Sequence, residues 1–151
     1  MIEISAVLLN KYGLFGVMIV TFISYSIIPF PSEAAVIGVA TVINPYYVLI
    51  FALIGSTFGV ILNYYTGLKG VKRILPKKIS KIYKKADKIF DKYGEVSILL
   101  FGWLPFIGDS LTILAGTFEM NFGKFLIYST IGRLIFLIAV IIIGVSIFGM
   151  I

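Results

Sequence analysis

The chain has 151 residues, enough for one domain, and 60% of them are apolar, with a mean hydropathy of +1.07. Soluble domains average about 45–50% apolar residues, so this excess predicts an all-α integral membrane protein. The sequence contains no Cys and no His, which excludes disulfides, thiol nucleophiles, imidazole bases and the usual zinc and haem ligands. We therefore expect no cofactor, no metal and no enzymatic activity.

Positive charge is concentrated in one stretch: the chain has a net charge of +6, and ten of its 13 basic residues lie between positions 69 and 92. Apolar sequence flanks this stretch on both sides, so we expect it to contact lipid headgroups and not nucleic acid. Basic residues in a short loop favour the cytoplasmic side, which predicts a multi-pass protein of a prokaryotic plasma membrane with segment 69–95 cytoplasmic. The expected headgroup surface consists of Lys77, Lys78, Lys81, Lys84, Lys85 and Lys88.

Two short apolar arms open the chain, at 14–28 and 34–43. A helix needs about 20 residues to span the hydrocarbon, so neither arm spans it alone. We expect a re-entrant helical hairpin that enters and leaves on the same side. One kinked spanning helix and a cleaved signal peptide over 11–26 are the alternatives. The break between the arms contains Pro29, Pro31, Ser32 and Glu33.

The next segment, 46–68, is long and apolar enough to span the membrane. Asn44 is its expected N-cap, and Pro45 suits the first helical position. Gly55 and Gly59 lie four residues apart and so share one helix face, which indicates close packing against another helix.

Segment 69–95 is expected to form an amphipathic connector. Its apolar residues recur at steps of three and four between Ile79 and Tyr93, and lysines occupy the remaining faces. This pattern fits an interfacial helix whose lysines reach lipid headgroups, and it fits equally a solvated helix packed on the bundle.

The second half repeats the order of the first. Two arms, 96–104 and 110–118, flank a second break, and 122–148 is long enough to span. We expect a second re-entrant hairpin followed by a second spanning helix. The second break contains Pro105, Gly108 and Asp109.

Matching residues in the two halves predict an inverted repeat. Lys11-Tyr12-Gly13 recurs 81 positions later as Lys92-Tyr93-Gly94. One spanning helix per half is an odd number, so the second copy is expected to be inverted relative to the first, as in alternating-access transporters. We expect a single membrane domain, 1–151, with repeats at 11–68 and 92–150. Beyond the breaks the interval is 77, and it relates Asn44 to Asn121, Gly55 to Gly132, and Gly67 to Gly144.

Ionisable side chains at membrane depth are costly and are therefore candidates for a substrate or ion site. Glu33 and Asp109 occupy equivalent places at the two breaks, and Arg133 lies within the last helix. We expect Arg133 to pair with Asp109, because an unpaired buried charge is expensive. An Arg133 that snorkels to the interface is one alternative. A second is that Ser32 and Asp109 only cap helices.

These residues resemble the DedA/VTT superfamily, also called SNARE-associated Golgi proteins. In the first half the resemblance is carried by Pro29-x-Pro31-Ser32-Glu33 and by Gly55-x3-Gly59-x4-Tyr64-x2-Gly67. In the second half, Lys92-Tyr93-Gly94 and Trp103-Leu104-Pro105-x2-Gly108-Asp109 resemble the YqaA-type subgroup in particular. The resemblance implies re-entrant hairpins in an inverted repeat and a lipid-transport function, since members include flippases and scramblases.

One departure from the family pattern bears on the cargo. Better-known DedA members carry two arginines around the second proline, which suit a phosphate group, whereas this chain has Gly102 and Gly108 there. The chain is therefore poorly equipped to hold polyprenyl phosphate, and zwitterionic lipid and ion-coupled small solutes both stay open as cargo. The leading hypothesis is a flippase-like or scramblase-like transporter of lipid headgroups. The alternatives are a proton- or cation-coupled small-molecule exporter, and a membrane scaffold; a homo-oligomer is compatible with all three.

Overall fold

The computed structural model describes residues 9–26, 32–69, 77–104 and 106–148, and every element within these ranges is helical. This confirms the all-α prediction. Pro29, Pro31 and Pro105 lie outside the described residues, as do the side chains of Lys77 and Lys78. The elements in chain order are the π-helical turn η1 (Leu9–Gly13) and the α-helices α2 (Leu14–Ser24), α3 (Glu33–Ala40), α4 (Pro45–Leu68), α5 (Lys77–Tyr93), α6 (Val96–Phe101), α7 (Ile107–Thr117) and α8 (Phe122–Phe148).

The two long helices are α4 and α8, with 24 and 27 residues, and both are apolar enough to cross a membrane. Asn44 caps α4 as predicted, because its side chain accepts a 3.0 Å hydrogen bond from the Tyr46 amide, and Pro45 follows at the first position. Its counterpart Asn121 accepts a 3.2 Å bond from the Lys124 amide at the start of α8.

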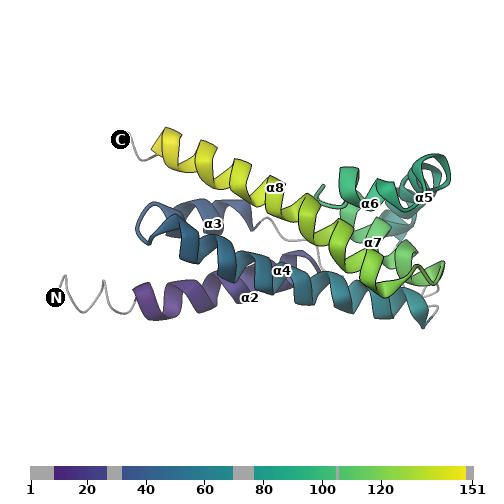
Figure 1. Ribbon diagram of the computed structural model, residues 1–151, viewed down its shortest axis with the longest axis horizontal. Coiled ribbons are helices and arrows are strands. Elements are labelled where there is room, and N and C mark those ends of the chain that lie inside the picture. Colours follow the sequence, from purple (N-terminus) through teal and green to yellow (C-terminus); the bar gives the residue numbers. More distant parts are fainter. Residues whose placement is uncertain (1–8, 27–31, 70–76, 105, 149–151) are drawn as a thin grey trace.

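The short helices divide between the two ends of the molecule (Figure 1). The long helices α4 and α8 run in opposite directions along its length, α2 and α3 lie beside the half nearer the termini, and α5, α6 and α7 gather around the other half. Figure 1 also shows α3 returning toward the end from which α2 starts. The most extensive contacts join α2 and α7 to α4, followed by those of α5 with α7 and of α4 with α8. Helices α6 and α3 also contact α8.

Glycines allow the backbones of these helices to touch. A Cβ on Gly55 would lie 2.1 Å from the carbonyl oxygen of Met18, and one on Gly59 would lie 2.8 Å from that of Phe22, so only hydrogen fits between α4 and α2. This confirms the predicted small-residue face. Because α2 packs into the core in this way, the signal-peptide alternative does not explain its sequence.

Helix α5 packs on the bundle through its apolar stripe. Ala86 is fully buried, and Ile89 and Phe90 contact Leu111 and Leu114 of α7 in one apolar cluster. Helix α7 is enclosed by α4, α5 and α6, and eight of its 11 residues are buried. The described lysines of α5 that the sequence assigned to the headgroup surface are exposed: Lys81, Lys84, Lys85 and Lys88.

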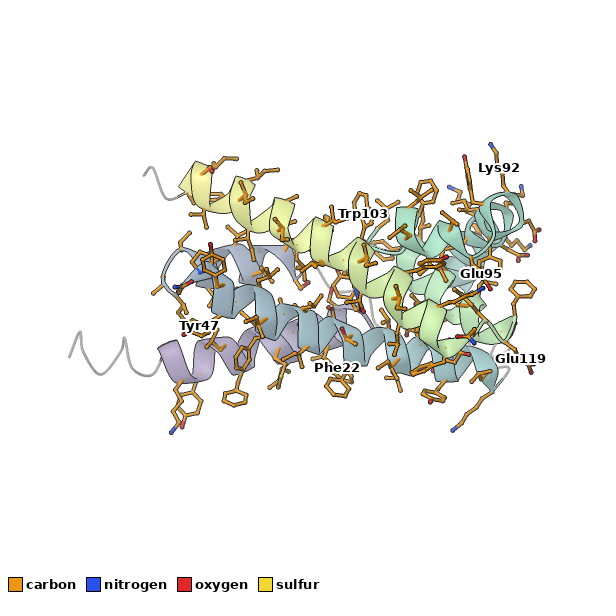
Figure 2. All side chains as sticks on the ribbon, viewed as in Figure 1. Phe22, Tyr47, Lys92, Glu95, Trp103 and Glu119 are labelled. Atoms are coloured by element: carbon orange, nitrogen blue, oxygen red, sulfur yellow. The ribbon has the colours of Figure 1, made fainter. Side chains whose placement is uncertain are left out.

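The outer surface is apolar along the sides and charged at one end. Large side chains such as Phe58 on α4 and Ile135 on α8 are 60% and 62% exposed. Figure 2 places Lys92, Glu95 and Glu119 at the end formed by α5 and α7, and Tyr47 near the opposite end. An apolar surface around an apolar core is expected of a protein whose solvent is lipid.

Candidate functional site

The site begins where α2 ends against α4. The close approach at Gly59 brings Tyr25, at the end of α2, beside Asn63 on the next turn of α4. The Asn63 Nδ2 group donates to the backbone carbonyl of Tyr25 at 3.0 Å and to Thr112 Oγ1 of α7 at 3.1 Å. Thr112 in turn donates to the carbonyl of Asp109 at 2.7 Å. One fully buried amide therefore connects the end of α2 to the start of α7.

The two predicted carboxylates lie at the starts of the two short returning helices. Glu33 is the first residue of α3, Asp109 is the third residue of α7, and both are partly buried. Each therefore lies in a first helical turn, where the helix dipole favours negative charge.

The capping-only alternative is wrong. Ser32 occupies the N-cap position of α3, but its side chain makes no capping hydrogen bond. Asp109 is not the N-cap of α7, because that position belongs to Phe106, whose φ of 67° is in the left-handed region that non-glycine residues rarely adopt. Such backbone persists only where the surrounding structure holds it.

Arg133 is buried in the centre of the bundle, with 1% of its surface exposed, so it does not snorkel. Its guanidinium donates to the Ser56 carbonyl at 2.6 Å and to Thr57 Oγ1 at 3.3 Å on α4, and to the Ser129 carbonyl at 3.1 Å on its own helix. The predicted ion pair with Asp109 is wrong: within the described ranges the only ion pair joins Lys124 to Glu95. Three uncharged oxygens, two on α4 and one on α8, accept from the guanidinium instead.

Tyr25 joins these groups. Its ring lies 5.9 Å from the guanidinium carbon of Arg133, and Glu33, Arg133 and Asp109 lie within electrostatic range of its phenol. Glu33 also lies within electrostatic range of Asp109. We call Tyr25, Glu33, Asn63, Asp109 and Arg133 the polar cluster. Its members come from both halves of the chain.

Sequence reasoning missed two members of the cluster. Asn63 is a strongly polar residue within a spanning segment, which is a usable signal, because such residues commonly bond across helices. Its Oδ1 is buried without a partner among the described residues. Tyr25 gave no signal, since a Tyr near the end of an apolar arm also fits an interface anchor.

Two aromatic residues of the family motifs lie outside the cluster. Tyr64 donates a 2.5 Å hydrogen bond to the carbonyl of Met120 and stacks on Phe125, so it holds the start of α8 to α4. Trp103 stacks on Phe136 of α8, midway along the molecule (Figure 2).

The glycines that replace the family's arginines are required by packing. A Cβ on Gly108 would lie 2.2 Å from the carbonyl oxygen of Gly102, because α6 ends directly against the start of α7. The second break therefore has no room for an arginine at position 108, so the guanidinium of Arg133 is the cation within the described part of this site.

Comparison with known proteins supports the resemblance seen in the motifs. The family model of the VTT domain matches residues 30–146. The chain is 28% identical to an alkaline phosphatase-like protein of Lactococcus lactis subsp. cremoris, over 95% of this chain and 75% of that protein. It is also 28% identical to the inner membrane protein YqaA of Escherichia coli, over 85% of this chain and 88% of YqaA. No solved structure matches it.

A further relative is the uncharacterized membrane protein YbfM of Bacillus subtilis, which is 22% identical over 94% of each chain. Two helices of the described structure are long and apolar enough to cross a membrane, and their outer faces are apolar. With the match over residues 30–146, these features show that the chain is an all-α membrane protein that belongs to the VTT domain family, as its DedA-like and YqaA-like motifs predicted.

Proposed function

We propose that this protein moves lipid headgroups between the two leaflets of a membrane, in the manner of a flippase or scramblase, through the polar cluster. The observation that carries the proposal is the cluster itself. Glu33, Asp109 and Arg133 come from three different helices and lie within electrostatic range of Tyr25, inside a bundle whose sides are apolar. Ionisable groups at such positions are expensive and mark transport pathways by default. The proposal involves no covalent step.

The charges of the cluster suit a zwitterionic headgroup. Two carboxylates, Glu33 and Asp109, offer acceptors to an ammonium group. Arg133 has five N–H donors, and its three bonds to protein oxygens leave two for one phosphate oxygen. One partly occupied guanidinium is a weaker site for a phosphate dianion than the arginine pair of other members.

We further propose that the halves form an inverted repeat, each half consisting of a re-entrant hairpin and a spanning helix. Paired contacts support this. Gly55 abuts Met18, and Gly132 abuts Leu99, the residue 81 positions after Met18. The placement of α2 and α3 toward one end and of α6 and α7 toward the other fits the same arrangement (Figure 1).

The repeat model implies an orientation. We propose a prokaryotic plasma membrane with segment 69–95 on the cytoplasmic side, where its lysines meet anionic headgroups. The apolar stripe of α5 is buried on α7 around Ala86, and the exposed residues of the helix include Lys81, Lys84, Lys85 and Lys88. This favours an electrostatic contact over insertion of α5 into the bilayer.

The transport proposal is tested with purified protein in liposomes that contain labelled phosphatidylcholine. We expect the labelled lipid to equilibrate between leaflets, and Glu33→Gln and Asp109→Asn each to slow this at least tenfold. Glu119→Gln is the matched control, because Glu119 is exposed and outside the cluster. Unchanged rates in both cluster variants would remove the basis of the proposal and favour the scaffold alternative.

A second candidate is a proton- or cation-coupled exporter. It is favoured by the electrostatic interaction of Glu33 with Asp109, since two carboxylates that repel each other favour binding of a proton or cation. The same liposomes separate the two functions. Lipid exchange that persists without any ion gradient supports the lipid transporter, and solute flux that collapses without a pH gradient supports the exporter.

The printed name of the Lactococcus relative describes it as alkaline phosphatase-like. For this chain we propose no phosphatase activity, because it has no His or Cys and its described residues include no group of three or more carboxylates that could hold a metal ion. Steady hydrolysis of p-nitrophenyl phosphate by the purified protein, absent from Asp109→Asn, would contradict this.

A further inference from the structure

An apolar groove lies between α3 and the end of α8. It encloses about 470 Å³ and is lined by Ala34, Ile37, Gly38, Thr41 and Phe148. Ile37, Gly38 and the C-cap Thr41 lie three, four and seven residues after Ala34, so these four residues share one helix face about 10 Å long. A Cβ on Gly38 would meet nothing within 4 Å, so the space above this glycine is empty because the residue has no side chain to fill it.

The chemistry of the groove indicates a hydrocarbon ligand. Thr41 is the one polar side chain of its lining, and its hydroxyl donates to the carbonyl of Gly38 at 2.7 Å. The groove therefore offers a ligand no free side-chain donor. Its volume falls within the range of about 300–1,000 Å³ typical of small-molecule sites. A narrow apolar groove on a membrane protein suits a single acyl chain.

The lining of the groove begins one residue after a member of the polar cluster in the sequence of α3. Its first lining residue, Ala34, directly follows Glu33, and its far end lies at Thr41, where α3 has ended. A molecule occupying both places needs a polar group at one end and a hydrocarbon chain at the other. Resting on the proposed function, we propose that the groove binds one acyl chain of a phospholipid whose headgroup lies at the polar cluster.

The groove is tested by filling it. Gly38→Leu places a branched side chain in the open space, and Ala34→Leu does the same at the end nearer the cluster. Gly16→Leu on α2 is the matched control, since a Cβ there also meets nothing within 4 Å, but Gly16 does not line this groove. The full chain of each variant is placed in liposomes containing phosphatidylcholine with a photoactivatable group in mid-chain, and labelled peptides are mapped by mass spectrometry.

We expect labelling of the wild type to concentrate on α3 and the end of α8, and to fall at least fivefold in Gly38→Leu and Ala34→Leu. Gly16→Leu should keep the wild-type pattern. Labelling spread evenly over α2, α4 and α8, or unchanged in both filled variants, overturns the proposal. A single cysteine at Gly38 that crosslinks two chains in the bilayer also overturns it, because a second copy then occupies the groove.

Binding and transport fail separately in this design. Labelling that depends on Gly38 supports the acyl-chain site whether or not lipid moves between leaflets. If Glu33→Gln abolishes lipid exchange while Gly38→Leu leaves the labelling unchanged, the proposed function stands and the groove has no part in it.

Discussion

The guanidinium of Arg133 donates a 2.6 Å hydrogen bond to the backbone carbonyl of Ser56, and these residues lie 77 positions apart. The same interval relates Asn44 to Asn121 at the starts of the two long helices. Arg133 therefore contacts its own counterpart in the other half of the chain. Since α4 and α8 pack together, this contact marks where the axis of the proposed repeat passes.

Replacing Arg133 should cost considerable stability. Arg133→Lys keeps the charge but loses the planar fork that reaches Ser56, Thr57 and Ser129 together. We expect the free energy of unfolding to fall by about 2 kcal/mol, because hydrogen bonds to charged groups contribute about 1.5–3 kcal/mol each and Lys recovers some of them. Denaturation by SDS in mixed micelles measures the change.

The control for Arg133 is Lys124→Met, which removes the exposed ion pair with Glu95. Exposed pairs contribute about 1 kcal/mol or less, so this variant should unfold close to the wild type. Equal losses in the two variants would contradict the role assigned to the buried guanidinium.

Asn63→Leu should impair transport while leaving both carboxylates in place. The variant removes the amide that holds Tyr25 to Thr112 and so separates the end of α2 from the start of α7. We expect lipid exchange to slow at least fivefold and stability to fall by about 1–3 kcal/mol. Thr66→Val on the same helix is the control, since that hydroxyl bonds only to its own helix. Wild-type exchange in Asn63→Leu would exclude Asn63 from the site.

Gly67→Ala should be among the most damaging small changes. A Cβ on Gly67 would lie 1.9 Å from the carbonyl oxygen of Ile113, and one on Gly116 would lie 1.8 Å from that of Tyr64, so α4 and α7 touch along their backbones. Forcing them apart should cost about 3 kcal/mol or more, as overpacking does at the upper end of its range. Thermal unfolding in detergent measures the loss.

Gly38→Ala is the control for that prediction, because its new Cβ meets nothing within 4 Å. It should raise stability by about 0.5–1 kcal/mol, the usual gain from replacing glycine within a helix. A Gly67→Ala protein as stable as Gly38→Ala would show that α4 and α7 are not in backbone contact.

Topology is testable without removing native thiols, since the chain has no cysteine. Single cysteines at Asn44, Ser80 and Asn121 are exposed to an impermeant thiol reagent in intact cells. The re-entrant arrangement predicts that Asn44→Cys reacts from outside, while Ser80→Cys and Asn121→Cys react only after lysis. Labelling of Asn121→Cys from outside would instead indicate four plain crossings.

The elements of the fold were predictable because they depend on local sequence. Apolar runs of sufficient length identified α4 and α8, and Asn44 marked where α4 begins. The spacing of apolar residues in 79–93 predicted an amphipathic helix, but it did not decide between lipid and protein as its partner. Ala86 is buried against α7, so the apolar stripe of this helix packs on protein.

The interior of the site was only partly predictable, because its contacts join distant parts of the chain. The energetic cost of charge at membrane depth identified Glu33, Asp109 and Arg133 as candidates, and all three lie within electrostatic range of Tyr25. The partner of Arg133 was missed, because backbone oxygens carry no residue-specific signal and any helix nearby offers them. Only the crossing of α4 and α8 determines that Ser56 supplies the acceptor.

Each long helix in this molecule packs against a short helix from the opposite half of the chain. Gly67 of α4 makes room for α7, and Gly144 of α8 makes room for Ile37 of α3, against which a Cβ would lie 2.6 Å away. In either half of the chain alone, no helix would pack against the long helix at this glycine. If the halves descend from one duplicated ancestor, that ancestor was already obliged to assemble in pairs, with two copies inserted head to foot, before the gene fusion joined them.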